Sequence, residues 1–115
     1  MKITIRFIID KSKINRKAEC PIKCRITYNK IRKEFATGLF ITSKYWNNKH
    51  QKAEPPNDET EFVNSQLSLI KSKINKAFLL LQVQEGNFTV DDIYTLYKGK
   101  KSAKEYNRLN TLKSS

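Results

Sequence analysis

Apolar and polar residues alternate strictly along the first part of the chain, and this alternation predicts a small β-sheet. In residues 22–28 every second side chain is apolar, while the intervening positions are polar or basic. A period of two places the apolar set on one face of a strand and the polar set on the other. Asn29 and Lys30 supply a turn, because Asn tolerates positive φ, and residues 31–39 lead back. Residues 20–40 therefore predict a β-hairpin with one core face and one solvated face.

Residues 2–9 repeat the alternation and predict a further strand. Its apolar positions are Ile3, Ile5, Phe7 and Ile9. The three strands predict an antiparallel sheet in which the first strand lies beside either the second or the third. Residues 10–18, DKSKINRKA, predict a mobile polar loop that is well placed to lie along phosphates. Gly38 indicates a bulge or a turn out of the sheet.

The period changes to that of a helix after Pro55 and Pro56, which mark a break in the chain. From about Asp58 to Glu85, apolar residues recur at steps of three and four, which is the spacing of one helix face. The apolar stripe consists of Val63, Leu67, Ile70, Ile74, Ala77 or Phe78, and Leu81. A second set is expected to widen this stripe, namely Phe62, Leu69 and Leu80.

The predicted fold class is α+β, a three-stranded antiparallel sheet packed on one long C-terminal α-helix, followed by a short helix and a tail. Thr89 to Asp92 resembles a capping box, which places the short helix at about Val90 to Tyr97. Residues 98–115 contain few apolar side chains and predict a linker or the start of another domain. We assign one domain to residues 1–86, and the short helix and linker to residues 87–115.

Positive charge is concentrated in the predicted sheet. The chain has 115 residues, enough for one modest core, and a formal net charge of +12. Residues 1–53 contain 14 Lys and Arg against three acids, whereas residues 54–97 contain three Lys against seven acids. A polyanion that binds the β-rich half explains this asymmetry better than general solubility does.

The sequence offers little for catalysis, metal binding or membrane insertion. His50 stands alone in a polar stretch, and there is no Gly-rich phosphate loop, metal-ligand cluster or Ser-His-Asp set. Cys20 and Cys24 lie roughly 13 Å apart along a strand, too far for a disulfide. No apolar run approaches ~20 residues, and the N-terminus has the pattern of a strand rather than a signal peptide. We predict no enzyme activity, cofactor, metal or membrane contact, and a cytoplasmic location.

Several stretches resemble a known family. Residues 25–38, RITYNKIRKEFATG, followed by Tyr45, Trp46 and Asn47, resemble the amino-terminal arm-type DNA-binding domain of tyrosine-recombinase integrases. The closest likeness is to integrases of phages and conjugative transposons in Bacteroides-like bacteria. Residues 64–75 and 88–94 are similar to the helix and linker of that family. The turn at Asn29 and Lys30 departs from the family, whose members often carry Asn-Gly there.

The resemblance implies sequence-specific binding of double-stranded DNA, with a three-stranded sheet in the major groove and the helix packed behind it. It also implies a full-length parent that is an integrase of a mobile element, active in DNA integration and recombination with other integrase protomers. The family's catalytic Arg, Lys, His and Tyr set is absent from this chain, so its tyrosines are not expected to be nucleophiles.

The polar face of the predicted sheet supplies the candidate DNA contacts, because side chains that project from strands in a major groove reach base edges. Arg25 and Arg32 suit bidentate pairing with guanine, and Thr4 and Thr27 suit thymine methyl groups. Glu34 either accepts from cytosine N4 or orients a neighbouring Arg, and we favour the orienting role. Residues better suited to phosphates are Lys2, Lys11, Lys13, Arg16, Lys17, Lys23 and Lys30, and Arg6 completes the candidate set.

Two alternative functions stay open. An RNA-binding module would stack bases on aromatic side chains exposed on its sheet, but Phe7, Tyr28 and Phe35 fall on the apolar face. A protein-interaction module would use the extra apolar positions of the long helix. Against that, Leu69 and Leu80 are expected to thicken the core or to meet a following domain. Salt-sensitive duplex binding separates DNA binding from protein interaction.

Overall fold

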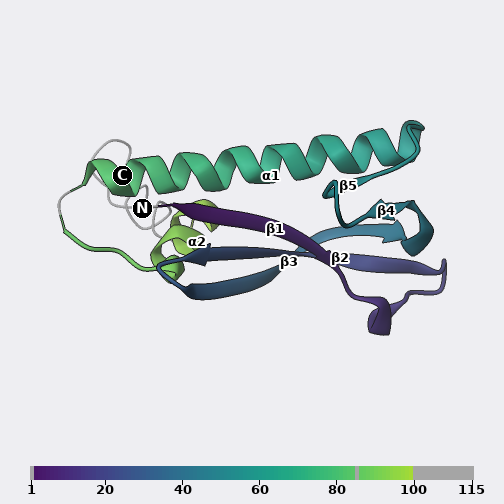
Figure 1. Ribbon diagram of the computed structural model, residues 1–115, viewed down its shortest axis with the longest axis horizontal. Coiled ribbons are helices and arrows are strands. Elements are labelled where there is room, and N and C mark those ends of the chain that lie inside the picture. The colour runs from purple at the N-terminus through teal and green to yellow at the C-terminus, as the bar shows by residue number, and fades with distance from the viewer. Residues whose placement is uncertain (1, 85, 100–115) are drawn as a thin grey trace, which may run out of the picture.

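The computed structural model describes residues 2–84 and 86–99, which form an α+β fold (Figure 1). Helix α1 (Asp58–Val83) runs along one face of a three-stranded antiparallel sheet, and helix α2 (Val90–Lys98) lies at one end of the same layer. The strands are β1 (Ile3–Ile9), β2 (Glu19–Tyr28) and β3 (Ile31–Thr42), in the order β1-β2-β3. The predicted fold class is confirmed. Of the two possible strand orders, the structure has the first strand beside the second.

The β2–β3 hairpin turns at Asn29 and Lys30, as the sequence predicted. Both residues have positive φ, 55° and 67°, the combination that a two-residue type I′ turn requires. Pairing continues from Tyr28 opposite Ile31 as far as Lys23 opposite Ala36. The turn therefore fixes which residues of the two strands lie side by side.

A bulge interrupts the hairpin farther along, at the place that Gly38 indicated. Between the pairs Pro21–Phe40 and Lys23–Ala36, β3 contains two more residues than β2. Gly38 has a φ of 85° there, which glycine adopts without steric cost. The Thr37 hydroxyl stabilises the bulge by donating to the backbone oxygen of Ile22 at 2.7 Å.

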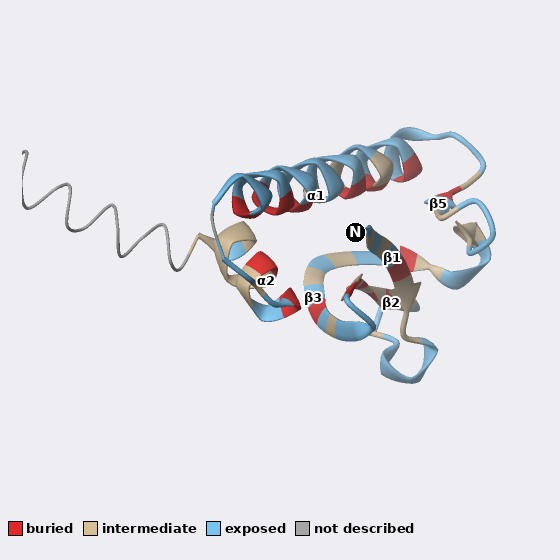
Figure 2. Ribbon diagram, turned by 60° about the vertical axis from the view of Figure 1, so that its left-hand side comes forward, coloured by how far each residue is buried: buried red, intermediate tan, exposed pale blue. Residues whose placement is uncertain are grey.

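The core lies between the inner face of the sheet and the two helices. The buried stripe of α1 agrees with the predicted one, except that Ile70 is only half-buried. Figure 2 shows this buried stripe in red on the side of α1 that faces the sheet. Cys20 and Cys24 are buried and free, and burial raises the pKa of the Cys24 thiol to about 12. No helix among the described residues has the length and hydropathy needed to cross a membrane.

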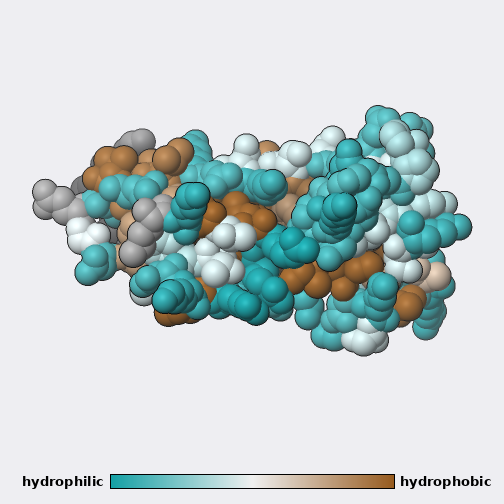
Figure 3. All heavy atoms as spheres, viewed as in Figure 1, coloured by the Kyte–Doolittle hydropathy of each residue, from teal (hydrophilic) through white to brown (hydrophobic). Residues whose placement is uncertain are grey.

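The expectation that Phe62, Leu69 and Leu80 widen the buried stripe is wrong. These residues are exposed by 59%, 48% and 48%, so they lie outside the buried stripe. Leu79 and Val83 are exposed as well, and Figure 3 shows hydrophobic side chains gathered over the C-terminal end of α1. The physical reason is geometric, because a sheet of three strands covers only one side of a helix. α1 therefore carries apolar residues on two faces.

Both helices begin with a capping box. At α1 the side chain of Asn57 accepts from the N–H of Thr60, and the Thr60 hydroxyl accepts from the N–H of Asn57, both at 2.8 Å. At α2 the predicted box of Thr89 and Asp92 is confirmed. α2 adds Val90 and Ile93 to the common core, while the division of the chain at residue 86 stays a prediction. Residues 100–115 of the predicted linker lie outside the described residues.

The sequence did not predict a small hairpin between β3 and α1. It follows the 3-10 helix η2 (Ser43–Tyr45) and consists of β4 (Trp46–Asn47) and β5 (Lys52–Ala53). The Gln51 amide accepts from the N–H of Phe7 at 2.7 Å and donates to the oxygen of Phe7 at 3.1 Å. This side chain satisfies the backbone at the free edge of β1, which otherwise invites pairing with another chain.

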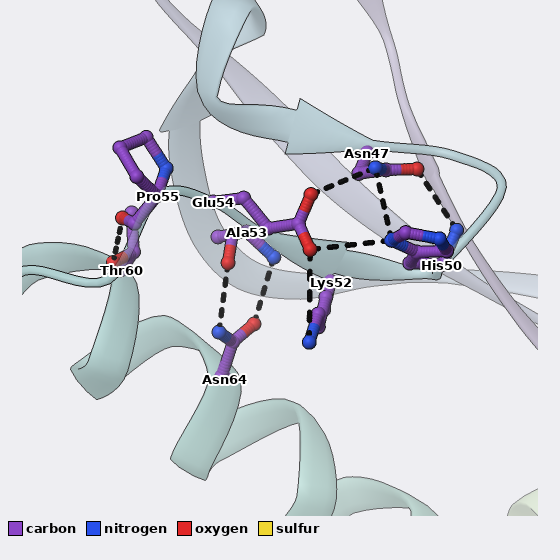
Figure 4. Close-up of polar contacts among 8 residues, drawn as sticks. All are labelled: Asn47, His50, Lys52, Ala53, Glu54, Pro55, Thr60 and Asn64. Carbon is purple, nitrogen blue, oxygen red and sulfur yellow. Dashed lines mark hydrogen bonds and ion pairs between the residues drawn. The ribbon is translucent and has the colours of Figure 1, made fainter.

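A second side-chain amide joins the hairpin to α1. Asn64 accepts from the N–H of Ala53 at 2.8 Å and donates to the oxygen of Ala53 at 3.0 Å (Figure 4). The hairpin is thus tied to the sheet by Gln51 and to the long helix by Asn64.

The two faces of α1 predict very different costs for the same substitution. Leu67→Ala removes a side chain that is 3% exposed and should lower the free energy of unfolding by about 2–5 kcal/mol. Leu79→Ala, at a position 60% exposed, should lower it by less than about 1 kcal/mol. Urea denaturation of both variants checks the difference, and equal costs would contradict this assignment of the faces.

Candidate nucleic-acid interface

Polar side chains form rows across the outer face of the sheet, the face away from α1. In the central row Arg6 lies opposite Arg25, and Arg25 lies opposite Glu34. The rows on either side consist of Thr4, Thr27 and Arg32, and of Ile8, Lys23 and Ala36. The structure thus brings together on one face seven predicted site residues: Thr4, Arg6, Lys23, Arg25, Thr27, Arg32 and Glu34.

Glu34 holds the guanidinium group of Arg25. The Nε of Arg25 donates to Oε2 of Glu34 at 2.8 Å, and both side chains are partly exposed. This contact leaves the two terminal nitrogens of Arg25 without hydrogen bonds to described residues. Bidentate pairing with O6 and N7 of guanine needs two such donors. The geometry favours the orienting role for Glu34.

The two arginines of the central row face each other across β1 and β2. Like charges at directly opposed positions destabilise a sheet, and only Arg25 has an acidic partner across the strands. Apolar or oppositely charged residues would serve the fold better at this place. An anionic partner removes the conflict, because it attracts both guanidinium groups at once.

The loop between β1 and β2 contains local structure that the sequence did not predict. It contains the 3-10 helix η1 (Lys11–Lys13), capped by the carboxylate of Asp10, which accepts from the N–H of Ser12 at 3.0 Å. Farther along, Asn15 accepts from the N–H groups of Lys17 and Glu19 at 2.9 Å. Its predicted phosphate-binding side chains are exposed and form no ion pair within the part of the chain that the structure describes. They are Lys11, Lys13, Arg16 and Lys17.

Lys23, Lys2 and Lys30 have different surroundings. The ammonium group of Lys23 lies 3.3 Å from Asp10, whose carboxyl pKa is lowered chiefly by hydrogen bonds from Ser12 and less by Lys23. The charge of Lys23 is therefore partly matched within the protein. Lys2 precedes β1 and borders a hollow with residues of α1 such as Leu79. Lys30 is exposed in the hairpin turn.

Sequence reasoning assigned no role to the β4–β5 hairpin. His50 has partners there, since its Nδ1 lies 3.1 Å from Nδ2 of Asn47 and 3.2 Å from Oε2 of Glu54 (Figure 4). The hydrogen bond from Asn47 lowers the pKa of the Glu54 carboxyl most, followed by the one from His50. Lys52 lies 3.6 Å from the same carboxylate. These contacts connect the two strands of the hairpin, so they have a structural explanation.

A comparison with protein families identifies the class of domain. A family model described as an arm DNA-binding domain matches residues 7–94, which include β2, β3 and α1. The chain belongs to the arm DNA-binding domain family. Neither the comparison with curated proteins nor the one with solved structures gives a match.

Membership of this family confirms the resemblance found in the sequence. Arm DNA-binding domains are DNA-binding modules of phage and tyrosine-recombinase integrases, and they are not catalytic. DNA is therefore the partner of this class of domain. The described residues contain no group of His, Cys, Asp and Glu side chains arranged to hold a metal ion.

The aromatic side chains of this arm DNA-binding domain gather mainly on the inner face of the sheet. Tyr28 stacks on Phe88, with ring centroids 5.0 Å apart, and Phe35 packs against Tyr94. Phe40, which sequence reasoning left without a role, lies opposite Pro21 at one end of the outer face and is 41% exposed. A single aromatic residue at the end of the sheet differs from a platform for several stacked bases.

The ion pair between Arg25 and Glu34 is exposed, so the fold should depend on it little. Glu34→Gln should change the free energy of unfolding by less than about 1 kcal/mol. Urea denaturation measures this change, with Glu61→Gln at an exposed position of α1 as the matched control. A loss of several kcal/mol would mean that Glu34 stabilises the fold rather than the arrangement of the outer face.

Proposed function

We propose that this arm DNA-binding domain recognises a specific double-stranded sequence with the outer face of its sheet in the major groove. The observation that carries the proposal is the central row, in which Arg6 and Arg25 face each other and Glu34 orients Arg25. A major groove ~12 Å wide admits β-strands, whose outward side chains reach base edges. The chain would be the part of a site-specific tyrosine-recombinase integrase, of a phage or other mobile element in the cytoplasm, that binds the arm sites.

The contacts divide into two kinds in this proposal. Arg25, Arg32, Thr4 and Thr27 lie on the strands and read base edges, because the backbone of the sheet holds them in fixed positions. The basic side chains of the loop between β1 and β2 neutralise phosphates, which positions the domain without reading sequence. Residues 1–86 would form the binding domain, and residues 87–115 a short helix and linker toward a core-binding domain.

RNA binding is the weaker alternative for the sheet. Modules that read single-stranded RNA stack bases on exposed aromatic residues of the sheet. Phe7, Tyr28 and Phe35 are at most 9% exposed and belong to the core. Their burial supports a duplex as the ligand.

Two alanine variants distinguish a base-reading residue from a phosphate-binding one. Arg25→Ala should weaken binding to the preferred duplex by ~1–3 kcal/mol and erode the preference over random DNA. Lys13→Ala should weaken both duplexes about equally and reduce the slope of log affinity against log salt by about 1. Fluorescence anisotropy titrations of both duplexes across a salt series measure these effects.

Lys73→Ala serves as the control, because it removes one positive charge from an exposed position of α1. It should leave both affinities nearly unchanged. Loss of sequence preference in Lys13→Ala with an unchanged salt slope would overturn the division between the two kinds of contact. An Arg25→Ala variant that binds like the parent would show that the central row does not read DNA.

The outward face of α1 favours a second, compatible function in protein assembly. Phe62, Leu69, Leu80 and Val83 expose large apolar side chains along this face, and the core does not use them. In a full-length integrase we propose that this face contacts another protomer. The arrangement leaves the outer face of the sheet free for DNA, because α1 packs against the inner face of the sheet.

Self-association of the domain tests this second function. Leu80→Glu should weaken association at least tenfold in sedimentation equilibrium, because a carboxylate in an apolar contact is costly to desolvate. Ser68→Glu introduces the same side chain at another exposed position of α1 and should leave association unchanged. A parent chain that stays monomeric at high concentration would contradict contact between copies.

A further inference from the structure

We propose that a hollow beside the edge strand β1 binds one phosphodiester group of the DNA backbone together with its deoxyribose. This inference rests on the duplex binding proposed above. The hollow has a volume of about 300 Å³, at the lower end of the range for small-ligand pockets. Its lining residues are Ile8, Ile9, Lys11, Ser43, Trp46 and Asn48. The fold builds it from β1 and its following loop on one side and from residues 43–48 on the other.

The polar groups that line the hollow are suited to donate hydrogen bonds. Neither the ammonium group of Lys11 nor the hydroxyl of Ser43 has a partner within the described residues. Asn48 accepts from Nε2 of Gln51 through its backbone oxygen at 2.9 Å and through Oδ1 at 3.1 Å. These contacts leave the amide NH₂ of Asn48 to donate. No carboxylate stands among the lining residues, and such a donor set suits a phosphate.

The remaining lining is apolar and suits a sugar. Ile8, Ile9 and Trp46 form this part, and a DNA strand alternates a charged phosphate with a largely apolar deoxyribose. The indole N–H of Trp46 is buried without a partner among the described residues. Buried donors in proteins are nearly always hydrogen-bonded, so the indole N–H of Trp46 is an exception that lies in a residue lining the hollow.

The position of the hollow agrees with a sheet that lies in the major groove. Ile8 lies opposite Lys23 in the register, so the hollow borders the outer face. Gln51 fixes the hairpin to the backbone of Phe7, which holds both walls in place before DNA arrives. In the major groove the edge strand of a sheet faces the phosphates of one DNA strand, and β1 is the edge strand on this side.

A second hollow lies next to the first and is a less suitable phosphate site. Trp46 also borders a hollow lined by Lys44, Tyr45, Asn47, Asn48 and Glu54. There the carboxylate of Glu54 is present and contacts Asn47, His50 and Lys52 (Figure 4). A negative charge on the wall opposes an anion, so the acid-free hollow beside β1 is the better phosphate site.

A charge placed in the hollow tests the proposal in the full chain. Ser43→Asp should weaken binding to specific and random duplexes equally, by at least tenfold at low salt, and should reduce the salt slope by about 1. Ser72→Asp is the matched control at an exposed position of α1 and should stay within twofold of the parent. Lys11→Ala should also reduce the slope of log affinity against log salt. If Ser43→Asp does not fold, Lys11→Ala is used in its place.

Trp46 provides a second readout, because it is the one tryptophan of the chain. Its fluorescence should change when the parent is titrated with duplex and should change less in Ser43→Asp. Inorganic phosphate is the competing ligand in a parallel titration. If phosphate changes the emission of the parent while Ser43→Asp binds duplexes normally, the hollow binds free phosphate and the assignment to DNA is overturned.

These measurements distinguish a failure of the proposed phosphate site from a failure of the proposed duplex binding. Equal duplex affinity of Ser43→Asp and Ser72→Asp, with a parent that binds, overturns the site and leaves the proposed function intact. A parent that binds no duplex overturns both.

Discussion

The inner face of the three-stranded sheet cannot stay in water, and α1 is the element that covers most of it. Phe7, Ile22 and Ile26 from the sheet and Ile74 from the helix are at most 2% exposed. Burying one such side chain contributes about 1.5–3 kcal/mol to the stability of the fold. An exposed ion pair on the outer face, such as that of Arg25 and Glu34, contributes less. This single layer of contacts therefore sets the orientation of the sheet, and the outer face points away from α1 as a consequence.

The division between the faces follows from the alternation of residues, so the sequence predicted it well. Period two along residues 22–28 placed Arg25 and Thr27 outward and Ile26 inward without any knowledge of the fold. The alternation does not predict the register, however, which determines the residues that lie opposite each other on neighbouring strands. That Arg6 lies opposite Arg25 depends on the pairing of β1 with β2, and the sequence was equally compatible with pairing to β3. The conflict between the two arginines could thus be seen only in the structure.

The β4–β5 hairpin was missed for another reason. Its strands contain two residues each, too few to show a period. Its position depends on two side-chain amides that reach backbone groups 44 and 11 residues away. Neither Gln51 nor Asn64 stands out in the sequence, because a side chain that bonds a distant backbone leaves no local pattern. For Phe62 and Leu80 the sequence did give a signal, but it was misleading. An apolar residue beside a buried helix stripe does not show how far the opposing sheet extends, so these two exposed side chains were wrongly expected to be buried.

The outer face can carry side chains that are not optimal for the stability of the sheet, because the core is formed on the other face. Arg6 beside Arg25 is a local cost to the sheet, and natural proteins accept such costs mainly at functional sites. Removing either charge would relieve repulsion between the strands while leaving Ile26 and its contacts untouched. The presence of this pair in an otherwise consistent sheet is therefore better explained by a ligand than by stability. A ligand that compensates two neighbouring guanidinium groups on one face of a sheet must carry closely spaced negative or acceptor groups, and the edge of a DNA groove has that property.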